Sequence, residues 1–181
     1  MFRMIAIVVV VVIAAVLIVA ATRPDTFRIQ RSMFVDAQPA IVFPLINDFH
    51  NWSQWAPQDR QDPSMKRTFS GSASGVGAIS AWQGSGDTGA GRMTISESVA
   101  PSRVTVVTDF EKPFHAHNTN RFVLEPAGSG TTVTWTMEGQ NLYLMKLMSV
   151  FVSMDRTMGK HFEDGLRNLK SAAESAGASA N

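Results

Sequence analysis

The chain has 181 residues, of which 45% are hydrophobic, and a formal net charge of +1 at pH 7. It contains no cysteine, which excludes disulfides, thiol nucleophiles and cysteine-ligated metals. Beyond residue 22, the 15 Lys and Arg (16 less Arg3) balance the 15 Asp and Glu without a basic block, so nucleic-acid binding has no electrostatic support.

An apolar run without any charge extends over residues 4–21. As a helix that rises ~1.5 Å per residue it is about 27 Å long, close to the ~30 Å of a bilayer's hydrocarbon core. We therefore expect residues 1–22 to be a single-pass anchor in the cell membrane. The alternative is a signal peptide cleaved near Ala20-Ala21, but the run is longer than the roughly 7–15 apolar residues of a signal sequence.

The charges beside the apolar run bear on its orientation. Arg3 precedes the run, and Arg23, Arg28 and Arg31 follow it. Lys and Arg concentrate on the cytoplasmic side, so the count slightly favours a cytoplasmic location for the large domain. The N-terminal amine adds a positive charge on the other side and leaves the orientation open.

A strand followed by two short helices comes next. Residues 27–35 alternate, with Phe27, Ile29, Arg31, Met33 and Val35 on one face, which predicts a strand. Asp36 can cap a helix that begins near Gln38-Pro39 and runs to about Asn47. Trp52 and Trp55 then lie on one side of a short helical turn that ends before Pro57, and indoles this large must be buried.

Six further strands are predicted between segments rich in Gly, Ser and Pro. They cover residues 66–70, 77–83, 91–99, 103–110, 115–125 and 131–138. The turn at Gly128-Ser129-Gly130 indicates a hairpin between the last two. Thr132, Thr134, Thr136 and Glu138 alternate with apolar residues, so this antiparallel sheet is expected to be apolar on one face and solvated on the other.

The rest of the chain is predicted to be helical. Residues 142–151 are either a lead-in or the start of one long helix, whose stripe of Met154, Met158, Phe162, Leu166 and Leu169 faces the sheet. Glycine inside a helix costs about 1 kcal/mol, so Gly159 and Gly165 indicate a close approach of backbone or ligand. The small, polar residues 171–181 are expected to fray.

Two motifs that suggest ligand sites have simpler explanations. The segment 84–89 matches GxGxxG, but a strand pattern follows it instead of the helix that a dinucleotide site needs, so it is a hairpin loop. His115 and His117 share one face of a strand, yet the parity that turns Phe122 inward turns both histidines outward. No metal site is predicted.

The same alternation places Asn118 and Asn120 on the apolar face, where a buried amide needs partners or a wet cavity. The methionines and aromatics on that face and on the last helix either fill a core or line a cavity for an apolar ligand. The candidate cavity residues are Trp82, Met93, Phe110, Asn118, Asn120, Phe122, Trp135, Met137, Met154, Met158 and Phe162. Among these, Asn118, Asn120 and Trp82 are expected to orient the ligand; Phe114 is a further candidate for the core.

No catalytic constellation is visible. There is no GxSxG nucleophile motif and no carboxylate pair in an apolar setting. His161, Asp155 and Glu97 are remote candidates for an acid or base. Hence no catalytic residue and no cofactor is predicted.

The part of the chain from about Phe27 to Glu174 resembles the START-like helix-grip (SRPBCC) superfamily, in its polyketide cyclase/dehydrase and lipid-transport branch. The order and spacing of several short pieces carry the resemblance: residues 35–37, 42–48, 52–57, 81–84, 91–95, 130–135 and 162–166. An N-terminal hydrophobic segment is similar to that of many bacterial members.

The resemblance implies an α+β fold in which a curved, seven-stranded antiparallel sheet grips the C-terminal helix over a cavity. The expected domains are the anchor 1–22, a ligand-binding domain 23–175 and a disordered tail 176–181. It also implies binding of an apolar small molecule or lipid, and it transfers no catalytic residue. The first hypothesis is thus a membrane-anchored, non-catalytic binder. The alternatives are a polyketide cyclase/dehydrase-like enzyme and an interaction protein with a filled core.

Overall fold

The computed structural model describes residues 2–58, 62, 64–85, 88–113, 115–150 and 152–179. Its helices are α1 (Phe2–Ala21), α2 (Pro39–Asn47), the 3-10 helix η1 (Phe49–Gln54), α4 (Tyr143–Met148) and α5 (Met154–Ser179). Its strands are β1 (Thr26–Val35), β2 (Lys66–Gly71), β3 (Ala78–Gln83), β4 (Ala90–Val99), β5 (Arg103–Lys112), β6 (Ala116–Ala127) and β7 (Gly130–Gln140).

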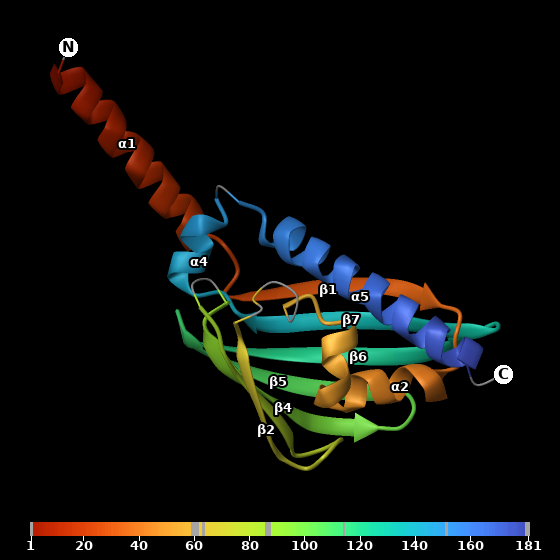
Figure 1. Ribbon diagram of the computed structural model, residues 1–181. Helices are drawn as coiled ribbons and strands as arrows, with labels where there is room; N and C mark the ends of the chain where they lie inside the picture. The colour runs from red at the N-terminus through yellow and green to blue at the C-terminus, as the bar shows by residue number, and fades with distance from the viewer. Residues whose placement is uncertain are drawn as a thin grey trace.

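The seven strands form one antiparallel sheet in the order β1-β7-β6-β5-β4-β3-β2. Helices α2 and α5 lie on the same face of this curved sheet, and α1 projects away from one end (Figure 1). A register shift between Ile95 and Glu97 of β4 helps the sheet to bend. This α+β helix-grip architecture is the one that the sequence predicted.

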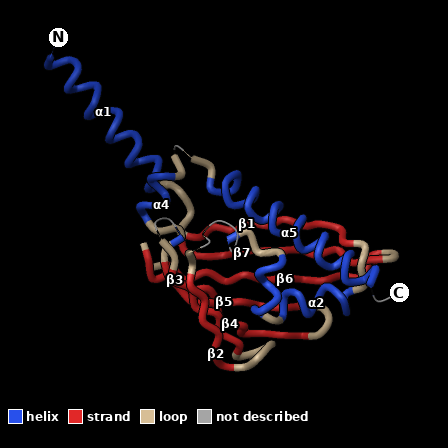
Figure 2. Tube along the Cα trace, in the orientation of Figure 1, coloured by secondary structure: helices blue, strands red, loops and turns tan. Residues whose placement is uncertain are grey.

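The two ends of the sheet differ. Gln83 pairs with Ala90, Ala90 with Lys112, and Thr26 with Gln140, so these residues meet at the end from which α1 leaves. We call it the α1 end. At the opposite, far end lie the β2–β3, β4–β5 and β6–β7 turns, as the trace in Figure 2 shows.

The tryptophan turn seals the far half of the core. Trp52 and Trp55 are 2% and 0% exposed. Their indole N–H groups donate to the carbonyls of Ile46 (2.9 Å) and Leu45 (2.8 Å), at the end of α2 where helix carbonyls lack intrahelical partners. The predicted burial of both indoles is confirmed, and these hydrogen bonds explain how η1 packs against α2.

Three local expectations are corrected or resolved. Asp36 does not cap α2: Gln38 is the N-cap residue without a side-chain bond, and the Asp36 carboxylate instead accepts from Ser129 Oγ (2.7 Å). Thr136 is only 7% exposed, because β7 lies between β1 and β6 and its hydroxyl bonds Gln30. Residues 143–148 form the separate helix α4 rather than the start of α5.

The expected fraying after residue 171 is also wrong over the described residues. Helix α5 continues to Ser179, and Ala173 is fully buried against the core. Glu174 accepts from the Asp36 backbone N–H (2.8 Å) and pairs with Lys170 (2.9 Å). Residues 176–179 of the expected tail are therefore helical.

Candidate functional site

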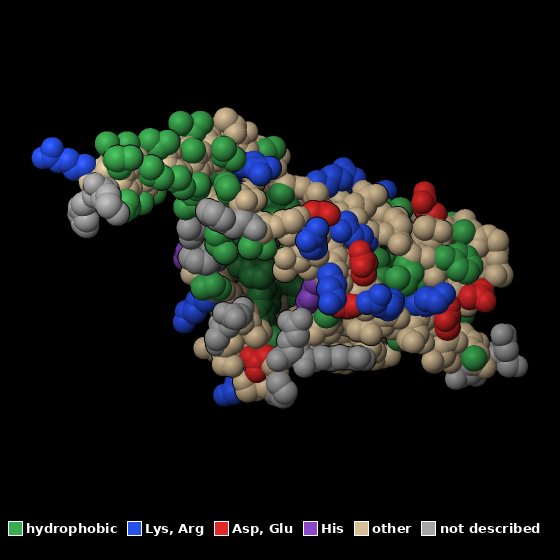
Figure 3. Space-filling model, turned by 90° about the horizontal axis from the view of Figure 1, so that it is seen from above, with side chains coloured by type: hydrophobic (Ala, Val, Ile, Leu, Met, Phe, Trp, Pro, Cys, Tyr) green, Lys and Arg blue, Asp and Glu red, His purple; other side chains and the backbone are tan. Residues whose placement is uncertain are grey.

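A cavity of about 320 Å³ lies between the sheet and the first three turns of α5. Its lining is mostly aromatic and methionine side chains from β3 to β7 and from α5. The lining residues are Trp52, Gln58, Met65, Arg67, Trp82, Thr88, Met93, Thr108, Phe110, Asn120, Trp135, Met137, Met158, His161 and Phe162. Figure 3 shows a hollow with hydrophobic side chains on the side of the molecule near α1.

The cavity exists because the two halves of the concave face are filled differently. In the far half, α2, η1 and the buried Leu166, Leu169 and Ala173 of α5 fill the space. At the boundary, the rings of Trp135 and Phe162 stack in parallel with centroids 4.0 Å apart. Beyond this stack α5 is the described helix that covers the sheet, Trp52, Gln58 and Met65 border the opening from the side, and no described helix replaces α2 there, so space remains.

One polar cluster interrupts the apolar wall. The Asn120 side chain accepts from the Trp135 indole N–H (3.0 Å) and donates to the Thr108 hydroxyl oxygen (3.1 Å). The oxygen and the nitrogen of the Asn120 side-chain amide thus each have a hydrogen-bond partner, as a buried amide requires. Because Thr108 accepts from Asn120, its own O–H remains a donor that a ligand oxygen in the cavity can use.

His161 lies on the helical wall of the cavity, one turn after Met158. Burial in these apolar surroundings lowers the pKa of His161, and the nearby Asp164 carboxylate opposes this change more weakly. The imidazole is therefore neutral near pH 7, with one nitrogen able to donate and the other to accept.

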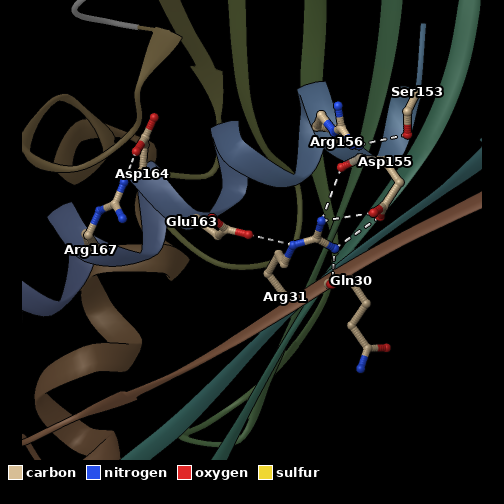
Figure 4. A network of polar contacts seen from close by, with 8 residues as sticks. All are labelled: Gln30, Arg31, Ser153, Asp155, Arg156, Glu163, Asp164 and Arg167. Atoms are coloured by element: carbon tan, nitrogen blue, oxygen red, sulfur yellow. Dashed lines mark hydrogen bonds and ion pairs between the residues drawn. The ribbon is translucent and has the colours of Figure 1, made fainter.

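The two carboxylates considered as acids or bases are engaged elsewhere. Arg31 of β1 donates to both oxygens of Asp155 (3.0 and 3.1 Å) and to Glu163 (2.9 Å), which ties α5 to the sheet edge (Figure 4). The hydrogen bond from Arg31 lowers the pKa of Asp155. Hydrogen bonds from Arg103 and Thr105 likewise lower the pKa of Glu97. Neither carboxylate is among the lining residues of the cavity.

The comparison with protein families now identifies the fold. A family model described as polyketide cyclase / dehydrase and lipid transport matches residues 26–174. The chain belongs to this family. No curated protein matches the chain significantly.

Solved structures with this fold are distant in sequence. The di-domain ARO/CYC StfQ from the steffimycin biosynthetic pathway has a TM-score of 0.63 at 10% identity, over 83% of this chain and 51% of that one. A protein from Thermus thermophilus gives 0.60 at 17% identity, over 83% and 99%. The major latex-like protein 151 of Panax ginseng gives 0.58 at 13%, over 82% and 97%. At these identities the likeness concerns the fold alone.

Within this family fold, most of the candidate residues come together. Trp82, Met93, Phe110, Asn120, Trp135, Met137, Met158 and Phe162 line the cavity. Three candidates lie elsewhere. Phe122 is fully buried under Trp52 and Trp55, Asn118 packs at Gly139, and Met154 packs against the core at the start of α5. The Trp82 N–H donates to the Thr88 carbonyl (3.1 Å) and is thus already used.

The predicted cavity wall lacked seven lining residues, of which His161 was expected only as a remote candidate for an acid or base: Trp52, Gln58, Met65, Arg67, Thr88, Thr108 and His161. Two had a usable signal. Thr108 is two residues before Phe110 on the same strand face, and His161 is three residues after Met158 on the same helix face. The other five depend on the placement of η1 and the chain after it, of the edge strand β2, and of the β3–β4 turn. Phe114 and part of the 84–89 loop lie outside the described residues, although the strands β3 and β4 on either side of that loop are confirmed.

Proposed function

We propose that this protein is a membrane-anchored, non-catalytic binder or carrier of a hydrophobic small molecule or lipid. The observation that carries the proposal is the cavity of about 320 Å³ under α5, in a family fold of lipid-transport and cyclase proteins. Its wall of Trp, Phe and Met side chains suits an apolar ligand, whose burial contributes about 25 cal/mol per Å². The described side chains leave this space open, which disfavours the hypothesis of an interaction protein with a filled core.

The polar cluster suggests how the ligand is oriented. Thr108 lines the cavity and is 4% exposed, and its hydroxyl oxygen accepts from Asn120, so its O–H can donate to a ligand carbonyl, ester or carboxyl oxygen. His161 offers a second donor or acceptor on the opposite wall. A ligand with one polar end and an apolar body fits this distribution. Asn120 positions Thr108 in this proposal, whereas Asn118 and Trp82 are now less favoured than the sequence suggested.

The anchor rests on α1. The helix Arg3–Ala21 is long and apolar enough to cross a membrane and almost all of its side chains are exposed, so it presents an apolar surface to its surroundings. The hydrocarbon core of a bilayer is a favourable environment for such a surface, and the helix pairs its own backbone N–H and C=O groups in hydrogen bonds. Tethering at a membrane shortens the path of a lipidic ligand from the bilayer to the cavity. The arginine count slightly favours the cytoplasmic side for the large domain.

Binding and delivery are tested together with a fluorescent fatty acid. Two forms of the protein are compared, the full chain and a truncated form of residues 23–181. Each is tested with and without Met158→Trp, and Met154→Trp is the matched control on the same helix outside the cavity lining. Met158→Trp fills the cavity and is expected to weaken binding at least tenfold, while Met154→Trp changes it little. Deletion of residues 1–22 leaves binding intact and slows transfer to acceptor vesicles. Equal binding by the two Trp variants, or an unchanged transfer rate, contradicts the proposal.

A natural ligand is sought by native mass spectrometry of the protein from its host, followed by lipid extraction. A specific apolar molecule that copurifies names the ligand class. An empty protein that also takes up no fatty acid or lipid probe contradicts the binder hypothesis.

The second candidate function is a cyclase or dehydrase acting on a polyketide-like substrate. One observation favours it: His161 lines the cavity with a lowered pKa, which suits a general base near neutral pH. If this candidate is correct, a polyketide-like substrate is consumed and His161→Ala abolishes turnover without abolishing binding. Absence of turnover with the wild-type protein counts against it.

A further inference from the structure

The segment that joins β7 to α5 exposes large apolar side chains. Leu142, Tyr143, Met148 and Val152 are 40%, 52%, 58% and 56% exposed. Lys146 is the sole charged residue between Asn141 and Ser153 in the sequence, and it is itself only 8% exposed because it forms an ion pair with Asp25. The four exposed side chains therefore form an apolar surface within which no described residue exposes a charge. We call this surface the α4 patch, defined by its four exposed side chains.

The α4 patch is attached to the end of α1. Figure 1 shows α4 beside the C-terminal end of α1, and the two helices are in contact. The Tyr143 hydroxyl donates to the Leu17 carbonyl (3.5 Å), and the Asn141 backbone N–H donates to the Asp25 carbonyl (2.7 Å). The Asn141 side chain also donates to the Pro24 carbonyl (3.1 Å). These contacts fix the position of α4 along the axis of α1, beside Leu17.

The position of α4 along the axis of α1 determines whether α4 is surrounded by water or by lipid. Leu17 lies four residues before Ala21, the last residue of the apolar helix, which at ~1.5 Å per residue is about 6 Å inside its end. If α1 is inserted to Ala21, Tyr143 beside Leu17 cannot be in bulk water. It lies where tyrosine is enriched in membrane proteins, at the boundary between hydrocarbon and headgroups.

We propose that the α4 patch is a second membrane contact, which lies in the interfacial layer of the bilayer. This proposal rests on the proposed function, because it requires α1 to span the membrane. The partner is the lipid surface, and the reason is continuity: the patch adjoins the span, has the same apolar character and carries no exposed charge.

The contact orients the cavity. Trp82, Thr88 and Phe110 belong to its wall and lie at the α1 end of the sheet, and Phe110 and Leu142 line one common depression there. With α4 in the interfacial layer, this end of the sheet faces the bilayer. The ligand then exchanges between cavity and membrane directly, without crossing water.

The absence of cysteine makes a direct test possible. The full chain is reconstituted into phosphatidylcholine vesicles with a single cysteine, Met148→Cys or Val152→Cys, carrying an environment-sensitive nitrobenzoxadiazole label. The matched controls are Val76→Cys and Val99→Cys, apolar positions with 57% and 41% exposure at the far end of the sheet. Flotation reports membrane anchoring, and quenching by lipid that is spin-labelled near the headgroup reports contact with the bilayer.

The expected result is that all four proteins float, and that quenching is several-fold stronger at positions 148 and 152 than at 76 and 99. If all four float and quenching is equally weak, the α4 patch is not a membrane contact, although α1 is still an anchor. If none floats, the anchor of the proposed function fails as well. A third outcome is that labels at 148 and 152 are shielded from water and quench each other, but are not quenched by spin-labelled lipid. This result overturns the proposal, because the α4 patch then contacts a second copy of the chain.

A functional readout uses the same contrast. Val152→Asp places a charge in the α4 patch and is expected to slow uptake of a fluorescent lipid from the vesicles several-fold. Val76→Asp, with similar solvent exposure (57% against 56%) at the far end, leaves uptake unchanged. Affinity for the probe in detergent solution is the same for both variants, which separates access from binding. Equal uptake by the two variants overturns the proposed route.

Discussion

At the scale of single residues, the cavity wall combines apolar bulk with few ionisable groups. Among its described residues these are Arg67 and His161. The Arg67 guanidinium donates to Ser80 Oγ (3.0 Å). The pKa of His161 is lowered by burial, so this side chain is neutral in the folded protein at pH 7 and resists protonation. Protonation of His161 therefore adds a positive charge to that of Arg67 in the wall only at an energetic cost.

This cost predicts a pH dependence of stability. The unfolded chain binds the His161 proton more tightly than the folded one, so the free energy of unfolding decreases as pH falls from about 7 through the unfolded value near 6.5. His161→Gln removes this part of the decrease between about pH 7 and pH 5. Urea denaturation of both proteins at a series of pH values measures it.

The carboxyl groups with lowered pKa values leave this pH window clear. The carboxyls of Asp155 and Asp109, whose pKa values are lowered by Arg31 and His117, titrate below this window and do not obscure it. A His161→Gln profile parallel to that of the wild type contradicts the prediction.

At the scale of elements, α5 depends on glycine where it meets other groups. A Cβ atom at Gly159 would lie 1.9 Å from Arg31 Nη2, and one at Gly165 would lie 2.9 Å from Trp135 Cζ3 and 3.2 Å from Pro57 Cδ. The guanidinium end of Arg31 is flexible and can move. The Trp135 ring is held by its stack with Phe162, so the second position is the stricter one.

Alanine substitutions in α5 should therefore have opposite effects at two positions. Gly165→Ala forces Trp135 to move, and overpacking of about 1–3 kcal/mol exceeds the roughly 1 kcal/mol gained in helix propensity. Gly177→Ala meets Ile41 at an ordinary 3.4 Å and raises the free energy of unfolding by a few tenths of a kcal/mol. Chemical denaturation measures both values. Shifts of the same sign in the two variants contradict this account.

The elements themselves could be predicted because their signals are local. Alternation located every strand to within about two residues, and the Met158–Phe162–Leu166 stripe located the sheet-facing side of α5. Gly159 and Gly165 are closely approached, but by the side chains of Arg31, Trp135 and Pro57 rather than by the expected backbone or ligand. Such patterns record which side of an element is buried, and burial is what holds the element in place.

The site could be predicted only in part because it depends on distant contacts. Asp36 would cap α2 by local rules, but Ser129, 93 residues away, takes its carboxylate. Asn118 and Asn120 share a face and are each 8% exposed, yet the position of α5 leaves a cavity only at Asn120. That position is fixed by Arg31 and by the aromatic stack, neither of which a strand pattern reveals.

At the scale of the whole molecule, the hollow part of the domain and the apolar helix occupy the same end. The far end is closed by α2 and η1, and the α1 end carries the cavity, the α4 patch and α1 itself. If α1 were cleaved as a signal peptide, α4 would lose the helix that it contacts, and that side of α4 would become exposed. A retained anchor keeps the cavity at the membrane.

We therefore expect the mature protein to keep residues 1–22. Its intact mass in host membranes should include them, and alkaline carbonate should not release it, because a membrane span over Arg3–Ala21, uncharged after its first residue, would be held by hydrocarbon rather than by charge. Val10→Asp places a carboxylate near the middle of the span at a cost of about 2.5–3.5 kcal/mol and lowers the membrane-bound fraction. Val76→Asp, at a similarly exposed position in the β2–β3 turn, leaves that fraction unchanged. A mature chain that begins near Thr22, or equal effects of the two substitutions, would show that α1 is removed or bound by something other than the bilayer.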